Sequence, residues 1–285
     1  MRGLNQYEIG KPVKAGKFSR QSIASSRSWK VKDDKSCAQT TNTGESLPRK
    51  EGRTHFTYDR VFDEHASTRE VFDVSARDIV NSFVHGISGS LIAYGQTGSG
   101  KTFTMQGKGS LKDGAEQTEG VIHMTVRTLF EELAKQQSST FLIRVSAIEV
   151  YNEDIRDLLV TSDEHRKVST RYDSKLGCSV DSTEKFVLNY EEMIGIFSIA
   201  DKNRIMKKTG MNDRSSRSHT MYKIILEKKD DGDSGNAYEI DSNEDESIQV
   251  STLNLVDLAG SDTVIRNTRI QDEAQKKEGS NINKR

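Results

Sequence analysis

The stretch "GSLIAYGQTGSGKTFTM", residues 89–105, joins a short apolar segment to a glycine-rich turn and then to Lys-Thr. It contains Gly-x-x-x-x-Gly-Lys-Thr at 95–102, the spacing of a phosphate-binding loop. Glycines let successive backbone N–H groups turn inward around phosphate oxygens, and the N-terminus of the helix that follows favours an anion. We therefore predict a nucleotide-binding loop between a strand at 90–94 and a helix.

The side chains of this loop suit a nucleotide that is bound together with magnesium. Lys101 supplies a point charge for the terminal phosphates, and the Thr102 hydroxyl suits a Mg²⁺ ion that bridges them. The alternative interpretation is a chance glycine turn, which the strand and helix patterns on either side disfavour. The loop alone does not choose between ATP and GTP, and it does not establish hydrolysis.

Two later segments carry polar groups suited to the same ligand. In "LNLVDLAGSD" an apolar strand ends at Asp257, whose carboxylate can hold magnesium through water, and the Gly260 amide can sense a γ-phosphate. In "NDRSSRSH", residues 212–219, three serines and two arginines indicate a loop that meets an anion. The simpler interpretations are a strand that ends in a turn, and a hydrogen-bonded turn before the next strand.

Hydrophobic periodicity predicts strands interleaved with helices from Thr54 onward, in a single α/β layered domain. The predicted strands lie at 55–62, 90–94, 140–151, 220–227 and 248–258, and the predicted helices lie at 67–86, 122–133 and 191–202. Ser67, with Glu70 three residues later, has the capping-box pattern, and Asn189 is placed to cap the third helix.

Composition predicts a soluble intracellular protein. The net charge of −1 gives no general attraction to nucleic acid or to an anionic membrane, so such a partner would need a local basic patch. Cys37 and Cys178 do not make a disulfide framework or a metal site and fit a reducing compartment. No apolar run approaches the roughly 20 residues needed to span a bilayer.

Two segments have the composition of disordered chain. Residues 1–28 are basic and rich in serine, which predicts a disordered tail, with an organelle transit peptide as the alternative. Residues 228–247 are acidic and are predicted to form a disordered hairpin loop.

Three segments, in this order, resemble the motor domain of the kinesin superfamily. They are "GQTGSGKT" at 95–102, "NDRSSRSH" at 212–219 and "DLAGSD" at 257–262, with further matches at 56–63, 145–159 and 278–284. The resemblance runs from Trp29 to Arg285 and implies a P-loop NTPase fold, with a mixed central β-sheet flanked by helices on both faces. It implies a cytoplasmic, cytoskeletal ATPase that binds Mg-ATP and moves along or remodels microtubules. The guanine-reading tetrapeptide Asn-Lys-x-Asp does not occur, which counts against a GTPase.

The resemblance also implies roles for individual residues. Those that cradle the phosphates would be Gly95, Gln96, Thr97, Gly98, Ser99, Gly100, Lys101 and Thr102, with Phe103 near the adenine. Those that serve magnesium would be Thr102, Ser216 and Asp257. The catalytic switch residues would be Ser215, Ser216, Arg217, Gly260 and Asp262, with Arg217 and Asp262 pairing behind the γ-phosphate. Those that contact tubulin would be Arg266, Arg269, Lys276, Lys277 and Asn281–Lys284.

The chain departs from the family pattern at three places. Asp262 stands where the family has glutamate, which withdraws the carboxylate by roughly 1 Å, a displacement that can cost on the order of 100-fold in rate. The family's opening strand, which contacts the adenine, has no match before Trp29, and the sequence stops at Arg285, inside the tubulin-facing helix. We therefore interpret residues 29–285 as a partial motor domain. The alternative function is a non-motile fragment that binds nucleotide or tubulin without useful turnover.

Overall fold

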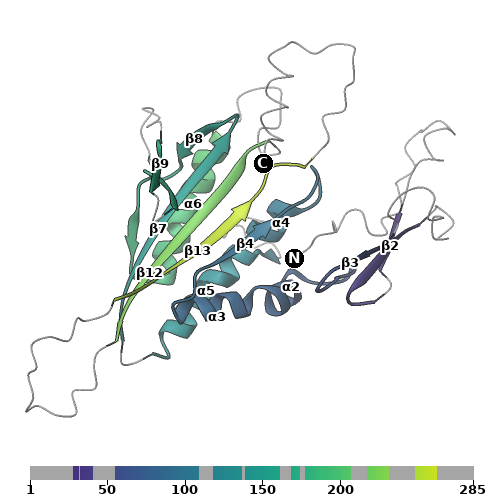
Figure 1. Cartoon of the computed structure of the whole chain (residues 1–285), viewed down its shortest axis with the longest axis horizontal. Helices are drawn as coiled ribbons and strands as arrows, with labels where there is room; N and C mark the ends of the chain where they lie inside the picture. Colours follow the sequence, from purple (N-terminus) through teal and green to yellow (C-terminus); the bar gives the residue numbers. More distant parts are fainter. Residues whose placement is uncertain are drawn as a thin grey trace, which may run out of the picture.

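The protein is described by a computed structural model. The described residues are 28–31, 33–40, 55–108, 118–136, 139–160, 168–173, 177–206, 217–230 and 248–261. A six-stranded sheet forms the centre, with helices packed against it (Figure 1).

The central sheet is mixed. Its strands are β4 (Gly89–Ala93), β7 (Ser139–Tyr151), β8 (Asp154–Asp157), β11 (Lys185–Val187), β12 (His219–Asp230) and β13 (Gln249–Asp257). Their order is β11-β7-β12-β13-β4, and β8 pairs with β7 outside this row. Strands β13 and β4 are parallel, while the other neighbours are antiparallel. The parallel register places Asp257 beside Ala93, just before the glycine loop, so two predicted site segments leave the sheet side by side.

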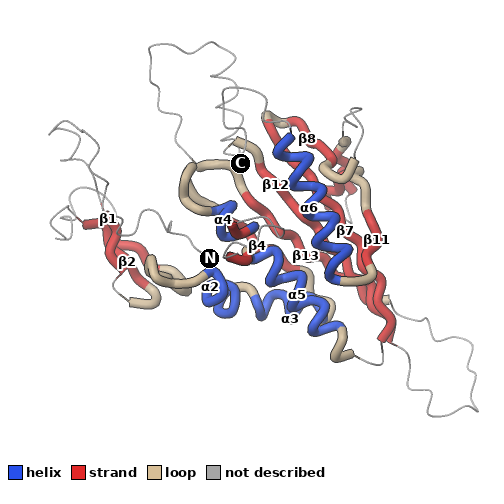
Figure 2. Tube along the Cα trace, turned by 180° about the vertical axis from the view of Figure 1, so that it is seen from behind, coloured by secondary structure: helices blue, strands red, loops and turns tan. Residues whose placement is uncertain are grey.

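The described helices cover one face of this sheet. They are α2 (Thr68–Ser75), α3 (Arg77–Val84), α4 (Lys101–Gln106), α5 (Val121–Leu133) and α6 (Tyr190–Met206). Figure 2 shows α3, α4, α5 and α6 in front of the strands, on the side turned away in Figure 1. In β13 the residues that face the helices, from Ser251 to Asp257 at every second position, are buried, and those between them are half-buried.

The core lies between the helices and the covered face of the sheet. Ile224, Leu253 and Leu255 are completely buried and belong to one cluster with Phe83 of α3 and Leu129 of α5. Each such side chain contributes about 1.5–3 kcal/mol through removal of apolar surface from water. This cluster fixes the ends of β4 and β13 relative to each other, and both strands lead into the candidate site.

Shorter sheets stand apart from the central one. Three strands form a separate sheet: β1 (Ser28–Val31), β2 (Ser36–Thr40) and β3 (His55–Thr57). Two-stranded pairs are β5 (Gly107–Lys108) with β6 (Thr118–Glu119), and β9 (Thr170–Asp173) with β10 (Gly177–Val180). The first of these pairs joins the end of α4 to the start of α5.

The helix caps follow the local sequence as predicted. The Ser67 side chain accepts a hydrogen bond from the Glu70 N–H at 3.1 Å, and the Asn189 side chain accepts one from the Glu192 N–H at 2.9 Å. The helix predicted from Ser67 to Gly86 is instead two helices, because Ala76 leaves the helical conformation with φ −122°.

Some predicted boundaries are corrected. The strand predicted at 55–62 ends at Thr57. Strand β12 continues to Asp230, which pairs with Ser139 of β7, so the first three residues of the loop predicted at 228–247 belong to a strand. Strand β1 begins at Ser28, the last residue of the predicted tail. The rest of the predicted tail and loop lies outside the described residues.

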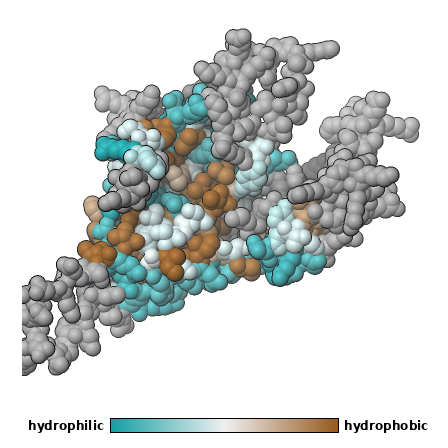
Figure 3. All heavy atoms as spheres, in the orientation of Figure 1, coloured by the Kyte–Doolittle hydropathy of each residue, from teal (hydrophilic) through white to brown (hydrophobic). Residues whose placement is uncertain are grey.

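The second face of the sheet carries exposed apolar side chains between polar ones. Ile92, Leu142 and Val250 are each about half exposed, and hydrophobic surface interrupts the polar surface in Figure 3. The prediction of a mixed sheet flanked by helices is confirmed, while helices on this second face are not tested by the described residues. Within the same residues no helix has the length and hydrophobicity needed to cross a membrane.

Candidate functional site

The glycine loop connects β4 to α4, as its sequence predicts. Gly98 and Gly100 have φ of +77° and +85°, a left-handed backbone that favours glycine. The Ser99 N–H donates to the Gln96 carbonyl at 3.2 Å, which closes the turn, and the Thr104 N–H donates to the Gly100 carbonyl at 2.8 Å, which starts the helix. Gln96, Thr97 and Gly98 are exposed, so the loop presents its backbone to solvent and to a ligand.

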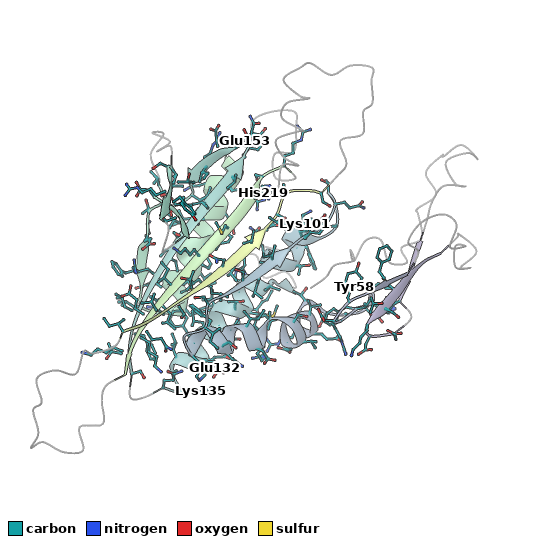
Figure 4. All side chains as sticks on the ribbon, viewed as in Figure 1. Tyr58, Lys101, Glu132, Lys135, Glu153 and His219 are labelled. Carbon is teal, nitrogen blue, oxygen red and sulfur yellow. The ribbon has the colours of Figure 1, made fainter. Side chains whose placement is uncertain are left out.

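Lys101 lies over this loop. Its Nζ donates to the carbonyl oxygens of Gly95 and Gln96, each at 2.9 Å. Figure 4 shows Lys101 and His219 close to the same end of the central sheet. The ammonium group is therefore held at the mouth of the loop, where the terminal phosphates of a bound nucleotide would lie.

Asp257 faces the start of α4 from the end of β13. Its Oδ2 accepts a hydrogen bond from the Thr102 hydroxyl at 2.6 Å, and its side chain is 2% exposed. Its Oδ1 is buried and has no hydrogen-bond partner among the described residues. Protein sites for Mg²⁺ supply one or two oxygen ligands and leave the other positions to water and phosphates. A hydroxyl and a buried carboxylate with an unused oxygen fit that requirement.

The segment after β13 runs along the glycine loop. The Leu258 N–H donates to the Ala93 carbonyl at 3.2 Å, and the Ser261 N–H donates to the Gly95 carbonyl at 3.0 Å. Gly260 lies between these two contacts and is buried. The segment predicted to be the second switch is therefore hydrogen-bonded directly to the glycine loop.

His219 joins the two predicted switches. Its Nδ1 accepts a hydrogen bond from the Ala259 N–H at 3.1 Å, so the end of "NDRSSRSH" is tied to "DLAGSD". His219 is the last residue of the "NDRSSRSH" motif, but we predicted no role for its side chain from the sequence. Its position at the end of the motif was the available signal.

Arg204 is a second residue that the sequence did not reveal. It lies in the last turn of α6, is 6% exposed, and its Nη1 is 3.5 Å from Asp257 Oδ2. No pattern in the sequence marks it, because 53 residues separate the two side chains. Arg204 therefore places a buried cation beside the carboxylate that fits magnesium.

The structure leaves several predicted site residues untested. Ser215, Ser216, Asp262 and the predicted tubulin contacts from Arg266 to Lys284 lie outside the described residues. Arg217 is described and half-buried, but its predicted partner Asp262 is not. Phe103 is half-buried on α4.

A cavity of about 110 Å³ lies beneath the loop, between β4 and helices α2 to α5. Its lining is mainly apolar, including Val71, Ile79, Leu91 and Met105. Phosphate oxygens need donors and positive charge, which suit the exposed backbone of the glycine loop better than this mainly apolar cavity.

Comparison with known proteins agrees with this geometry. The family model "Kinesin motor domain" matches residues 14–285, which begins inside the predicted tail. Kinesin-like protein KIN-7I of Oryza sativa subsp. japonica is 37% identical over 230 residues, covering 80% of this chain and 18% of that protein. Centromere-associated protein E of Homo sapiens is 37% identical over 235 residues, covering 82% of this chain and 8% of that protein.

Two further known proteins align with a larger share of this chain. Kinesin-like protein KIN-7L of Oryza sativa subsp. japonica is 35% identical over 93% of this chain and 38% of its own length. A solved structure described as a fast kinesin matches with a TM-score of 0.72 and 29% identity, covering 93% of this chain and 68% of that one. The chain thus spans well under half of these curated relatives. By the family match and the shared fold, it belongs to the kinesin motor domain family.

Proposed function

We propose that this chain is a microtubule-based motor domain that binds Mg-ATP and hydrolyses it to drive movement along, or remodelling of, microtubules. The observation that carries the proposal is the contact between the glycine loop and the end of β13, where Thr102 donates to Asp257 at 2.6 Å. The similar fast kinesin structure is associated with an ATPase mechanism and with interactions with microtubules, which supports the same activity here. We divide the chain into a tail that ends before β1 begins at Ser28 and a motor domain that continues from there to residue 285.

In this proposal the loop residues 95–102 bind the phosphates through backbone N–H groups and the Lys101 ammonium. Magnesium, when bound, would neutralise phosphate charge, with Thr102, Ser216 and Asp257 holding it directly or through water. Phe103 would lie near the adenine.

The switch residues would respond to the γ-phosphate. Ser215, Ser216 and Arg217 form the first switch, and Gly260 and Asp262 belong to the second. Pairing of Arg217 with Asp262 would place the attacking water. The contact of Ser261 with Gly95 supports coupling between the second switch and the loop.

The proposed partner is the microtubule, and the proposed location is the cytoplasmic cytoskeleton. The contacts would be Arg266, Arg269, Lys276, Lys277 and Asn281–Lys284, which supply a local basic patch on a chain of net charge −1. A cationic patch of this kind suits the acidic surface that a microtubule presents, and its contribution would weaken as salt is raised.

The first experiment measures steady-state ATP hydrolysis by the full chain with and without polymerised tubulin. We expect stimulation by microtubules and a loss on the order of 100-fold in Lys101→Ala, since one preorganised charge at the phosphates is removed. Lys135→Ala is the matched control, because Lys135 is an exposed lysine at the end of α5, far from the loop in Figure 4.

The alternative function is a non-motile module that binds nucleotide or tubulin without useful turnover. It predicts that a labelled nucleotide binds and is displaced by ATP, while hydrolysis stays at the Lys101→Ala level with or without microtubules. Equal displacement by GTP would count against ATP as the ligand. Asp262→Glu adds a further test: if the shorter side chain limits turnover, this variant raises the rate by up to about 100-fold.

A further inference from the structure

Polar side chains lie beneath the nucleotide site, between α6 and the central sheet. One of them, Asp201 of α6, accepts hydrogen bonds from the Tyr222 hydroxyl of β12 and from the Gln106 side-chain amide of α4 at 2.8 Å. Two other polar atoms differ from it: within the described ranges, the Thr220 hydroxyl oxygen and Oδ1 of Asp257 are buried and form no hydrogen bond. Buried polar atoms without partners are uncommon in folded proteins, so these two call for a physical reason.

Thr220 and Asp257 lie directly opposite each other. Thr220 is the second residue of β12 and Asp257 is the last residue of β13, and the antiparallel register pairs them. Paired residues of adjacent strands point to the same face of a sheet, with Cβ atoms about 4.5–5.5 Å apart. Thr220 is 0% exposed and Asp257 is 2% exposed. A buried hydroxyl donor therefore lies within one side-chain rotation of an unused carboxylate oxygen.

A second carboxylate lies on the other side of Thr220. Glu149 of β7 is its register partner there and is 2% exposed. Glu149 takes part in an interaction of its own, whereas Asp257 has an oxygen with no hydrogen-bond partner in the described part of the chain. An ionised carboxylate only accepts hydrogen bonds, so the hydroxyl must be the donor. Asp257 is therefore the better acceptor for Thr220.

A second donor would fix the orientation of Asp257. Its Oδ2 accepts from the Thr102 hydroxyl at 2.6 Å, which holds one oxygen but lets the plane of the carboxylate turn about that contact. A donor on Oδ1 would remove this freedom. Each carboxylate oxygen accepts more than one hydrogen bond, so Oδ1 could accept from Thr220 and from a magnesium-bound water together. Groups that orient a metal-serving side chain in this way have a strong effect on metal affinity.

We propose that Thr220 is a positioning residue for magnesium in the nucleotide site: its hydroxyl turns to donate to Asp257 Oδ1 and fixes that carboxylate for the ion. The same contact joins the start of β12, which follows the predicted first switch, to the end of β13, which leads into the second. This inference rests on the proposed Mg-nucleotide function.

Thr220→Val is the sharpest test, because valine keeps the branched shape and removes the hydroxyl. Thr220→Ser is the conservative variant, which keeps the donor and loses a methyl group. The matched control is Thr125→Val. Thr125 is also 0% exposed, and its hydroxyl likewise has no hydrogen bond within the described residues, but it lies on α5 and not on a strand paired with β13.

The measurement is binding of N-methylanthraniloyl-ADP by the full chain, first in EDTA and then across a Mg²⁺ titration. In Thr220→Val we expect the Mg²⁺ concentration for half-maximal effect to rise on the order of 10-fold, the lower part of the range for loss of a group that orients a metal ligand. Binding in EDTA should be unchanged, because the proposed role of the hydroxyl is toward the ion. Thr220→Ser should stay close to the unmodified chain, and Thr125→Val should match it.

Thermal unfolding gives a second readout that does not depend on turnover. Removal of a buried hydroxyl that has no partner should not destabilise the ligand-free protein, so both valine variants should be at least as stable as the unmodified chain. With nucleotide at limiting Mg²⁺, Thr220→Val should gain less stability than Thr125→Val, because a ligand stabilises the folded state according to its affinity. A ligand-free Thr220→Val protein that is clearly destabilised would overturn the inference, since the hydroxyl would then have a structural partner already.

The outcomes separate the inference from the function beneath it. If the unmodified chain shows no Mg²⁺-dependent nucleotide binding, the proposed function fails and this inference fails with it. If the unmodified chain responds to Mg²⁺ and Thr220→Val responds at the same concentration, only the inference is overturned. It is also overturned if Thr220→Ser or Thr125→Val shifts the Mg²⁺ midpoint as far as Thr220→Val does, because the Thr220 hydroxyl is then not the cause.

Discussion

Two glycine-to-alanine substitutions should change stability in opposite directions. Gly120 caps the start of α5 with φ −85° and ψ 168°, a backbone that alanine adopts without strain. A Cβ placed there would lie 2.4 Å from the Met105 carbonyl oxygen and 2.3 Å from the Gln106 carbonyl carbon. Ordinary contacts begin near 3.4 Å, so α4 and α5 must separate by about 1 Å. Gly195 lies in α6, is exposed, and a Cβ there meets nothing within 4 Å.

The magnitudes follow from these contacts. Gly120→Ala should lower the free energy of unfolding by about 3 kcal/mol, the upper part of the range for overpacking, because the atoms struck are backbone and cannot rotate away. Gly195→Ala should raise it by about 0.5–1 kcal/mol, since alanine loses less backbone entropy in a helix. Equilibrium denaturation in guanidinium chloride measures both, with the slope compared to confirm an unchanged unfolding transition.

Nucleotide binding gives a second measurement for the same two glycine variants. Since α4 begins at Lys101 and ends against Gly120, Gly120→Ala should also weaken N-methylanthraniloyl-ADP binding, while Gly195→Ala should leave it unchanged. A Gly120→Ala protein as stable as the unmodified chain would refute the reasoning, because the close contact between α4 and α5 would then be absent in solution.

Three further predictions concern the packing of the core, the cap of α2 and the protonation of His123. Leu255→Ala should cost about 3 kcal/mol, because the side chain is completely buried in the core, and a loss below about 1 kcal/mol in denaturation would contradict that packing. Ser67→Ala should cost about 1 kcal/mol through loss of the α2 cap, with Ser67→Asp expected to restore it. Burial lowers the pKa of His123 below 6.5, so the unfolded chain takes up the proton first and stability should fall as pH drops below 6.5, by at most about 1.4 kcal/mol per pH unit. Denaturation at pH 7.5 and 5.5 should show this slope, and His123→Gln should lack that part of it.

Much of the candidate site could be predicted because its signals are local. The phosphate loop is eight consecutive residues, so its turn and the helix after it depend on neighbours in the chain. The caps at Ser67 and Asn189 are local for the same reason, since each spans three residues. The place of Asp257 was predicted because an apolar strand ends there, and the parallel pairing with β4 then brought it to the loop.

The residues that surround the site could not be predicted from local signals in the sequence. Asp201 meets Gln106 across 95 residues and Tyr222 across 21, and no spacing rule links such positions. The break of the first helix at Ala76 also escaped prediction, because hydrophobic residues continue at helical spacing through it. The strand order and the single helix-covered face of the described sheet depend on which surfaces bury one another.

The sequence by itself determined the spacing of the phosphate loop, the motif segments at 212–219 and 257–262, the strand and helix alternation, and therefore the family. The tertiary structure alone decided that Arg204 lies beside Asp257, that His219 holds Ala259, and that Asp201 contacts both α4 and β12. The physical reason is the separation along the chain over which each kind of interaction acts. Turn and cap energies act between residues a few positions apart, whereas the charge and hydrogen bonding of a buried carboxylate are set by whatever groups the packed core brings within about 3–4 Å of it.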